Sequence, residues 1–220
     1  FSILNKDDSS YSYLKTIVSG KIITYGFDQE ATLYAGSVRL LGDSSLFKIV
    51  SGAKWSNPNT SILRSVEVKE EVRLCLPGMY NIANALAAAA VSLELGLSFK
   101  QVRKGLESFT HLEGRFDEIN LGKPFRVIID FAHTPNALAQ VLELSLKIKN
   151  QSFDRLRIDH ERSRTGQNAK LIVVFGCAGE RDREKRSMMG EIAGKLAELT
   201  ILTAEDPRLE NVNDIIDQIA

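Results

Sequence analysis

The stretch of sequence that decides the fold is KLIVVFGCAGERDREKR, at residues 170–186. After Lys170, residues 171–175 form an apolar run that ends at Gly176, which is typical of a buried β-strand. The glycines and charges that follow predict a loop, and the pattern then becomes helical to about Glu198. A strand, a loop and a helix in this order predict one unit of a parallel α/β sheet.

The same order occurs on both sides of this stretch. Upstream, FRVIID at residues 125–130 predicts a buried strand, followed by a helix from Pro135 to about Lys149 with Thr134 as its N-cap. Downstream, residues 199–203 predict a third strand that leads through EDPR at 205–208 into a last helix. Three such units with apolar strands predict a parallel sheet covered by helices.

The chain before residue 112 has a different pattern. Short β-rich segments come first, and two helices follow, the second capped by Ser98. The predicted strands are residues 21–26, 31–41, 45–50 and 61–76, and the predicted helices are residues 80–95 and 98–108. We therefore expect two α/β domains, at 1–112 and 113–220.

The composition is that of a globular protein that binds neither nucleic acid nor membrane nonspecifically. It is 44% hydrophobic and 25% charged, with 28 Lys+Arg against 28 Asp+Glu. Residues 74–93 carry no charge but contain Pro77, Gly78 and many alanines, which favours a buried helix over a membrane span. Two cysteines, Cys75 and Cys177, suit a reducing compartment and make no zinc site.

Both ends of the chain indicate a piece of a longer protein. The sequence starts at Phe1 without an initiator Met and stops at Ala220 inside a helix-like run. No signal peptide is visible, and we expect a cytoplasmic protein. Residues 151–169 are polar and Arg-rich and predict an exposed, mobile insertion rather than a nucleic-acid site. His111 and His160 are expected on the surface.

Ligands bind at the carboxyl ends of strands in an open parallel sheet, where three charged loops are expected here. The first carries Asp130 and His133, which suit a ribose and a phosphate; alternatively Asp130 caps the next helix and His133 packs. The second lacks a dinucleotide fingerprint, and its Arg181 and Lys185 suit carboxylates or phosphates. A solvated helix start is the alternative for those two cations.

The third loop places Glu205, Asp206 and Arg208 around Pro207. This mixed charge suits a zwitterion, and an internal salt bridge is the alternative. Asn81 and Asn84 share one face near the start of a helix, where they could read a base edge or cap the helix.

Several of these motifs come in the order and spacing of the Mur ligase family, which the chain resembles from Ile3 to its end. Within the family the resemblance is to the tripeptide synthetase (MurE) type. The motifs are ILNKDD at 3–8, GMYNIANALAA at 78–88, GRF at 114–116, DFAHTP at 130–135, GCAGERD at 176–182 with KR at 185–186, and DPR at 206–208.

The resemblance implies the end of a P-loop-type central domain followed by a Rossmann-like C-terminal domain. It implies an ATP- and Mg²⁺-dependent ligase that activates the carboxylate of a UDP-muramoyl peptide as an acyl phosphate, which an amino acid's amine then attacks. By resemblance, Asn81 and Asn84 would contact the adenine. Arg115 would contact the nucleotide and Asp130 would hold its ribose. His133 would lie near the phosphates or the acyl phosphate. The amino acid would meet Arg181, Asp206 and Arg208.

Two departures from the family pattern matter. The family's Asp-Asn-Pro-Arg motif, which goes with diaminopimelate, reads Glu-Asp-Pro-Arg here at residues 205–208. The amino acid that is added could therefore be diaminopimelate-like or lysine, although Arg208 favours a substrate with a distal carboxylate. The family's phosphate-binding loop, magnesium ligands and modified lysine precede the matched stretch, so we expect this chain alone to be inactive. The alternatives are another Mur-superfamily ligase, such as folylpolyglutamate synthase, and a noncatalytic Rossmann-like nucleotide-binding module.

Overall fold

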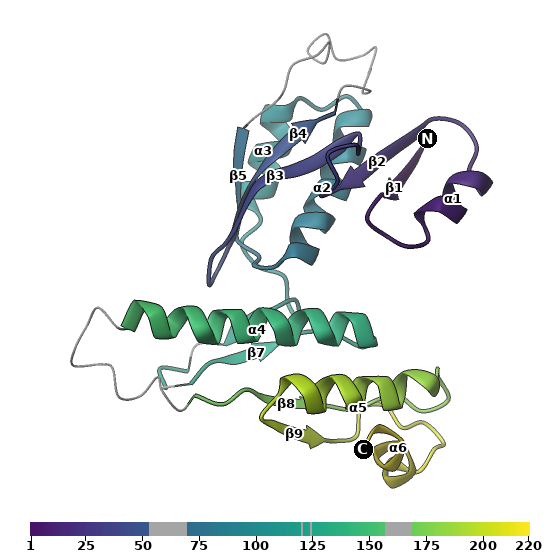
Figure 1. Cartoon of the computed structure of the whole chain (residues 1–220), viewed down its shortest axis with the longest axis vertical. Coiled ribbons are helices and arrows are strands. Elements are labelled where there is room, and N and C mark those ends of the chain that lie inside the picture. Colours follow the sequence, from purple (N-terminus) through teal and green to yellow (C-terminus); the bar gives the residue numbers. More distant parts are fainter. Residues whose placement is uncertain (53–69, 120, 124, 157–168) are drawn as a thin grey trace. The chain divides into compact units, whose positions relative to one another are not determined.

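The computed structural model describes residues 1–52, 70–119, 121–123, 125–156 and 169–220. It divides into two compact units, Phe1–Glu113 and Gly114–Ala220, next to the boundary expected near residue 112 (Figure 1). Both units combine strands and helices, so the predicted α/β class is confirmed.

The N-terminal unit is built on a five-stranded sheet in the order β1-β2-β3-β4-β5. The first three strands are parallel, and β4 and β5 are added antiparallel. Residues 61–69 of one expected strand lie outside the described residues, and α1 was not among the expected elements. The elements are β1 (Ser2–Asn5), α1 (Tyr11–Ile17), β2 (Ile22–Gly26), β3 (Leu33–Leu40), β4 (Ser45–Ser51), β5 (Glu70–Leu74), α2 (Met79–Glu94) and α3 (Phe99–Ser108).

The core of this unit lies between the sheet and α2. Phe47 and Ile49 of β4 are fully buried, as are Leu86 and Ala89 of α2. The small alanines let the helix lie close to the strands, which explains the uncharged, Ala-rich run as part of a core. No helix in the described part of the chain is long and apolar enough to cross a membrane.

A capping box starts α3 at the predicted residue. The Ser98 hydroxyl accepts from the Gln101 N–H, and the Gln101 side chain accepts from the Ser98 N–H at 2.8 Å. The two side chains satisfy donors that the first helical turn leaves open.

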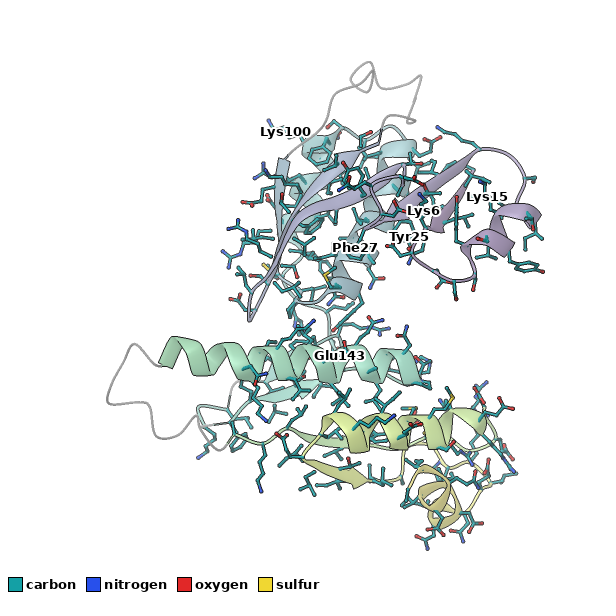
Figure 2. All side chains as sticks on the ribbon, in the orientation of Figure 1. Lys6, Lys15, Tyr25, Phe27, Lys100 and Glu143 are labelled. Carbon is teal, nitrogen blue, oxygen red and sulfur yellow. The ribbon has the colours of Figure 1, made fainter. Side chains whose placement is uncertain are left out.

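The ends of β1 and β2 are joined by side chains of the ILNKDD motif. Asp7 accepts hydrogen bonds from the backbone N–H of Phe27, at 2.7 Å, and of Asp28. The Lys6 N–H donates to the Tyr25 carbonyl, and its ammonium pairs with Asp28 at 2.9 Å. Lys6, Tyr25 and Phe27 are labelled in Figure 2.

The described part of the C-terminal unit contains two separate strand pairs and three helices. β8 and β9 are parallel, whereas β6 and β7 form an antiparallel pair. The elements are β6 (Asp117–Ile119), β7 (Val127–Ile129), α4 (Pro135–Leu156), β8 (Ile172–Phe175), α5 (Glu184–Leu196), β9 (Leu199–Leu202) and α6 (Val212–Ile219).

The prediction of one parallel sheet through all three units is wrong for the described strands. β7 has only three residues and pairs with its neighbour in sequence, β6, while β8 and β9 pair with each other. The strands are also half-buried rather than buried: Val173 and Phe175 pack on the core, whereas the alternating Ile172 and Val174 are 52% and 60% exposed.

Helix α4 is longer than expected. It continues beyond Lys149 to Leu156, so the first residues of the predicted insertion at 151–169 are helical. The remainder, residues 157–168, lies outside the described residues. The core of this unit joins α4, α5 and α6 through Leu138, Leu142, Met189, Ile215 and Ile219, with Cys177 between them.

Candidate functional site

Hydrogen bonds hold the three predicted loops together within the C-terminal unit. The Lys185 ammonium, at the start of α5, donates to the His133 carbonyl in the loop after β7, at 2.8 Å. The Gly179 N–H, in the loop after β8, donates to the Asp206 carbonyl in the loop after β9, also at 2.8 Å. The charged side chains singled out in these loops therefore belong to one region of the unit.

Asp130 organises the turn that carries Arg115. Its carboxylate accepts from the Phe116 N–H at 2.8 Å, while the Thr134 hydroxyl accepts from the Ala137 N–H and caps α4. The alternative that Asp130 caps this helix is therefore wrong. Burial raises the pKa of Asp130, and the backbone N–H bonds and the nearby Arg115 charge oppose that rise.

An exposed aromatic ring lies close to two candidate residues. The Arg115 guanidinium is 5.2 Å from the ring centroid of Phe131, and the His133 ring is 4.9 Å from the same ring. Phe131 is 59% exposed. A ring flanked by a cation and an imidazole suits a planar or anionic group. Phe131 was not among the residues singled out from the sequence, although its place between Asp130 and His133 was a usable signal.

The glycines of the second loop allow two backbones to approach closely. A Cβ on Gly176 would lie 2.2 Å from the Thr203 carbonyl oxygen, and a Cβ on Gly179 would lie 1.9 Å from that of Pro207. Neither position tolerates a side chain without a shift of the facing loop. These glycines therefore join two loops of the protein, which fits the absence of a dinucleotide fingerprint around them.

The third loop contains the salt bridge that was the alternative to a ligand site. The Arg208 Nε is 3.6 Å from the Asp206 carboxylate, and their side chains are 33% and 67% exposed. An exposed ion pair of this kind contributes little to the stability of the fold. Both side chains can therefore give up this pair and bind a ligand instead. Arg208 has a left-handed backbone with φ 50°, and Arg181 is exposed on the second loop.

An ion pair between buried Arg186 and half-buried Glu210 was not found from the sequence. Arg186 is 0% exposed and forms two hydrogen bonds to the Glu210 carboxylate, at 2.9 and 3.1 Å. The bonds from Arg186 and from the Glu180 N–H lower the pKa of Glu210 to about 2. In the sequence Arg186 is one cation in a charged run, and its partner is distant along the chain.

This lowered pKa predicts an acid-sensitive C-terminal unit. A carboxylate whose folded pKa is depressed stabilises the fold above its ordinary pKa and loses that contribution as the pH falls toward about 2. Urea unfolding followed at pH 5, 4 and 3 should therefore show a falling midpoint, and Glu210→Gln should flatten the dependence. Glu143→Gln, at an exposed position on α4 labelled in Figure 2, is the control and should keep the wild-type slope.

The asparagine pair lies in the N-terminal unit, and its two members differ. Asn81 is buried, and its side-chain amide donates to the Pro77 carbonyl at 2.8 Å, which holds the start of α2. Asn84 is exposed. Cys75 and Cys177 are free, and burial raises the pKa of the Cys177 thiol.

His111 is exposed, and His160 lies outside the described residues. Among the residues that the structure describes, no group of three His, Cys, Asp or Glu side chains is placed to hold a metal ion.

The structure thus defines a two-unit α/β protein with a charged loop cluster at the ends of the C-terminal unit's strands. Family models of the Mur ligase middle domain and of the Mur ligase glutamate ligase domain match residues 1–92 and 158–220, which together make up more than half of the sequence. The chain belongs to the Mur ligase family.

Two curated relatives carry the name UDP-N-acetylmuramoyl-L-alanyl-D-glutamate–2,6-diaminopimelate ligase. The protein from Caldanaerobacter subterraneus is 35% identical over 218 residues, which are 99% of this chain and 38% of the relative. The protein from Bacillus velezensis is 32% identical over 96% of this chain and 36% of its own length. The chain therefore spans less than two fifths of either relative.

Solved structures show the same fold. MurF from Acinetobacter baumannii aligns with a TM-score of 0.63 at 21% identity, over 92% of this chain and 38% of that protein. At this identity the likeness concerns the fold alone.

Proposed function

We propose that this chain is part of an ATP-dependent ligase that adds an amino acid with a distal carboxylate, of the diaminopimelate type, to a UDP-N-acetylmuramoyl dipeptide. The observation that carries the proposal is the pair of loops joined at Gly179 and Asp206, which bear Arg181 and Arg208 in a chain 35% identical to a diaminopimelate ligase. In such a reaction ATP supplies the phosphoryl group that activates the peptide's carboxylate.

The cluster of Asp130, Arg115, Phe131 and His133 is proposed to bind the nucleotide and the group it activates. A carboxylate has about four acceptor sites, so Asp130 keeps some for ribose hydroxyls while it accepts from the Phe116 N–H. Arg115 and His133, which both lie next to the Phe131 ring, would supply a cation and an imidazole for phosphate oxygens. Taken by itself, the N-terminal unit offers exposed Asn84 as the candidate for an amide contact to a base, because Asn81 holds the start of its own helix.

The loops after β8 and β9 are proposed to bind the amino acid. Asp206 would accept from its ammonium group, while Arg208 and Arg181 would donate to its carboxylates, Arg208 after releasing Asp206. No described cluster fits Mg²⁺, so no step is derived through the metal. The UDP-muramoyl peptide as partner, Mg²⁺ as cofactor and a cytoplasmic location belong to this proposal by family membership.

Replacing Arg208 tests the amino-acid assignment in the whole protein that contains this chain. Arg208→Ala should raise the KM for diaminopimelate by roughly tenfold to a hundredfold, because a charge-assisted hydrogen bond contributes about 1.5–3 kcal/mol. The KM for ATP should stay within about twofold. Amide formation should be measured with diaminopimelate, lysine and ornithine in turn.

Arg126→Ala provides the matched control for this experiment. Arg126 pairs with Glu118 on the β6–β7 hairpin and should leave both KM values at the wild-type level. An unchanged KM for diaminopimelate in a folded Arg208→Ala protein would contradict the assignment of Arg208 to the amino acid. Turnover with none of the three amino acids by the wild-type protein would contradict the ligase itself.

A further inference from the structure

We propose that the ion pair of buried Arg186 and half-buried Glu210 positions the two loops that would bind the amino acid, so that the integrity of this pair sets the affinity for the incoming amino acid. This inference rests on the proposed function. The pair would act through Arg181, Asp206 and Arg208, which are called the pocket residues below. Arg186 and Glu210 touch no substrate in this scheme, and they are positioning residues.

One guanidinium joins three segments of the C-terminal unit. Arg186, on α5, donates to the Ala178 carbonyl in the loop after β8 at 3.1 Å and to the Glu210 carboxylate in the loop after β9. It also donates to the Gln218 side chain on α6 at 2.7 Å. The two loops that carry the pocket residues are thereby tied to each other and to both helices.

Glu210 extends the same network to the residue next to Arg181. Its carboxylate accepts from the Glu180 N–H at 2.5 Å, and Glu180 has a left-handed backbone with φ 52°. A nonglycine residue in that conformation is held by its surroundings. The position from which Arg181 projects therefore depends on Glu210.

The other side of the network holds the turn at Arg208. The Glu210 N–H donates to the Pro207 carbonyl at 2.9 Å and closes the turn around Arg208, which is also left-handed. Glu210 thus contacts both turns that contain a left-handed residue. Its side chain holds the turn at Glu180, and its backbone N–H closes the turn at Arg208.

The electrostatics favour a positioning role over a purely stabilising one. Burying an arginine is costly, and a buried ion pair is often no more stabilising than apolar side chains of the same size. Arg186 also leaves its Nε without a partner among the described residues. Since the pocket residues themselves are exposed, their geometry depends on the backbone that this pair fixes.

The test compares kinetic constants in the whole ligase. Glu210→Gln keeps the size of the side chain and removes its charge, and it should raise the KM for diaminopimelate roughly tenfold. The KM for ATP should stay within about twofold. A variant that merely folded less well would lower kcat for every substrate and leave both KM values unchanged.

Matched variants complete the experiment. Gln218→Leu removes one bond to Arg186 at an exposed helix position and should raise the diaminopimelate KM by a smaller factor, which keeps the test available if Glu210→Gln does not fold. Glu191→Gln breaks an exposed ion pair with Lys195 on α5 and should change neither KM. Folded variants with an unchanged diaminopimelate KM, or with an equal rise in the ATP KM, would overturn the inference. A wild-type protein that uses no diaminopimelate would instead overturn the proposed function.

Discussion

Gly190→Ala is expected to destabilise the C-terminal unit by about 3 kcal/mol or more. A Cβ at this position of α5 would lie 1.6 Å from the Ile219 carbonyl oxygen at the end of α6. That atom belongs to backbone and has no rotamer into which to retreat. Overpacking of this kind costs about 1–3 kcal/mol, and displacing α6 also exposes the buried side chains of Ile215 and Ile219.

Gly194→Ala in the same helix is the matched control. No described atom lies within 4 Å of the position its Cβ would take, and alanine is the better helix former. This variant should be stabilised by roughly 0.5–1 kcal/mol. Urea unfolding of both variants, followed by circular dichroism, measures the difference. If both variants changed the free energy of unfolding by the same amount and in the same direction, the close approach of α5 and α6 would be refuted.

Phe47→Ala is expected to cost the N-terminal unit about 3–5 kcal/mol, the usual range for removing a buried aromatic ring. Phe47 is 0% exposed on β4, which is hydrogen-bonded to β3 on one side and β5 on the other. The cavity would open beneath α2, and a helix already packed through alanines has little side-chain volume with which to fill it.

Tyr13→Ala removes a comparable aromatic side chain from the surface of the same unit. Tyr13 is 66% exposed on α1, so its loss should change the free energy of unfolding by less than about 0.5 kcal/mol. Chemical denaturation measured for both variants compares the two positions directly. If Phe47→Ala cost no more than Tyr13→Ala, the core of this sheet would be wrongly placed.

Elements with strong local signals could be predicted from the sequence. The helix that starts at Ser98 has a capping box, and the helix at Pro135 has Thr134 before it, so residues a few positions apart specify both starts. Helix α1 gave no such signal. None of its residues is buried, and it therefore carries no apolar stripe that a pattern search could detect.

Strand pairing could not be predicted in the same way. An apolar run indicates a strand but does not say which neighbour it bonds to, and β7 pairs with β6 although the pattern suggested a parallel partner. The same limit applies to burial. Ile172 and Val174 lie on an exposed face of β8, although their side chains are as apolar as those of Val173 and Phe175.

The loops of the candidate site and the types of residue in them could be predicted from the sequence, but the contacts between those residues could not. Asp130, Arg115 and His133 could each be named, whereas the bond from the Phe116 N–H to Asp130 depends on a turn that only the fold brings near. Likewise, nothing local distinguishes buried Arg186 from its neighbour Lys185, which reaches the His133 carbonyl. A cation's burial is decided by distant partners such as Glu210.

The two units have separate hydrophobic cores. The buried residues clustered around Phe47 and those clustered around Met189 have no member in common, and each cluster lies within its own unit. Either half could therefore accumulate core substitutions without requiring compensation in the other. Exchange of the segment after residue 113 between related proteins would keep each cluster intact. Under the proposed function, the loops proposed to bind the amino acid could then differ between relatives while the buried cluster around Phe47 stays as it is.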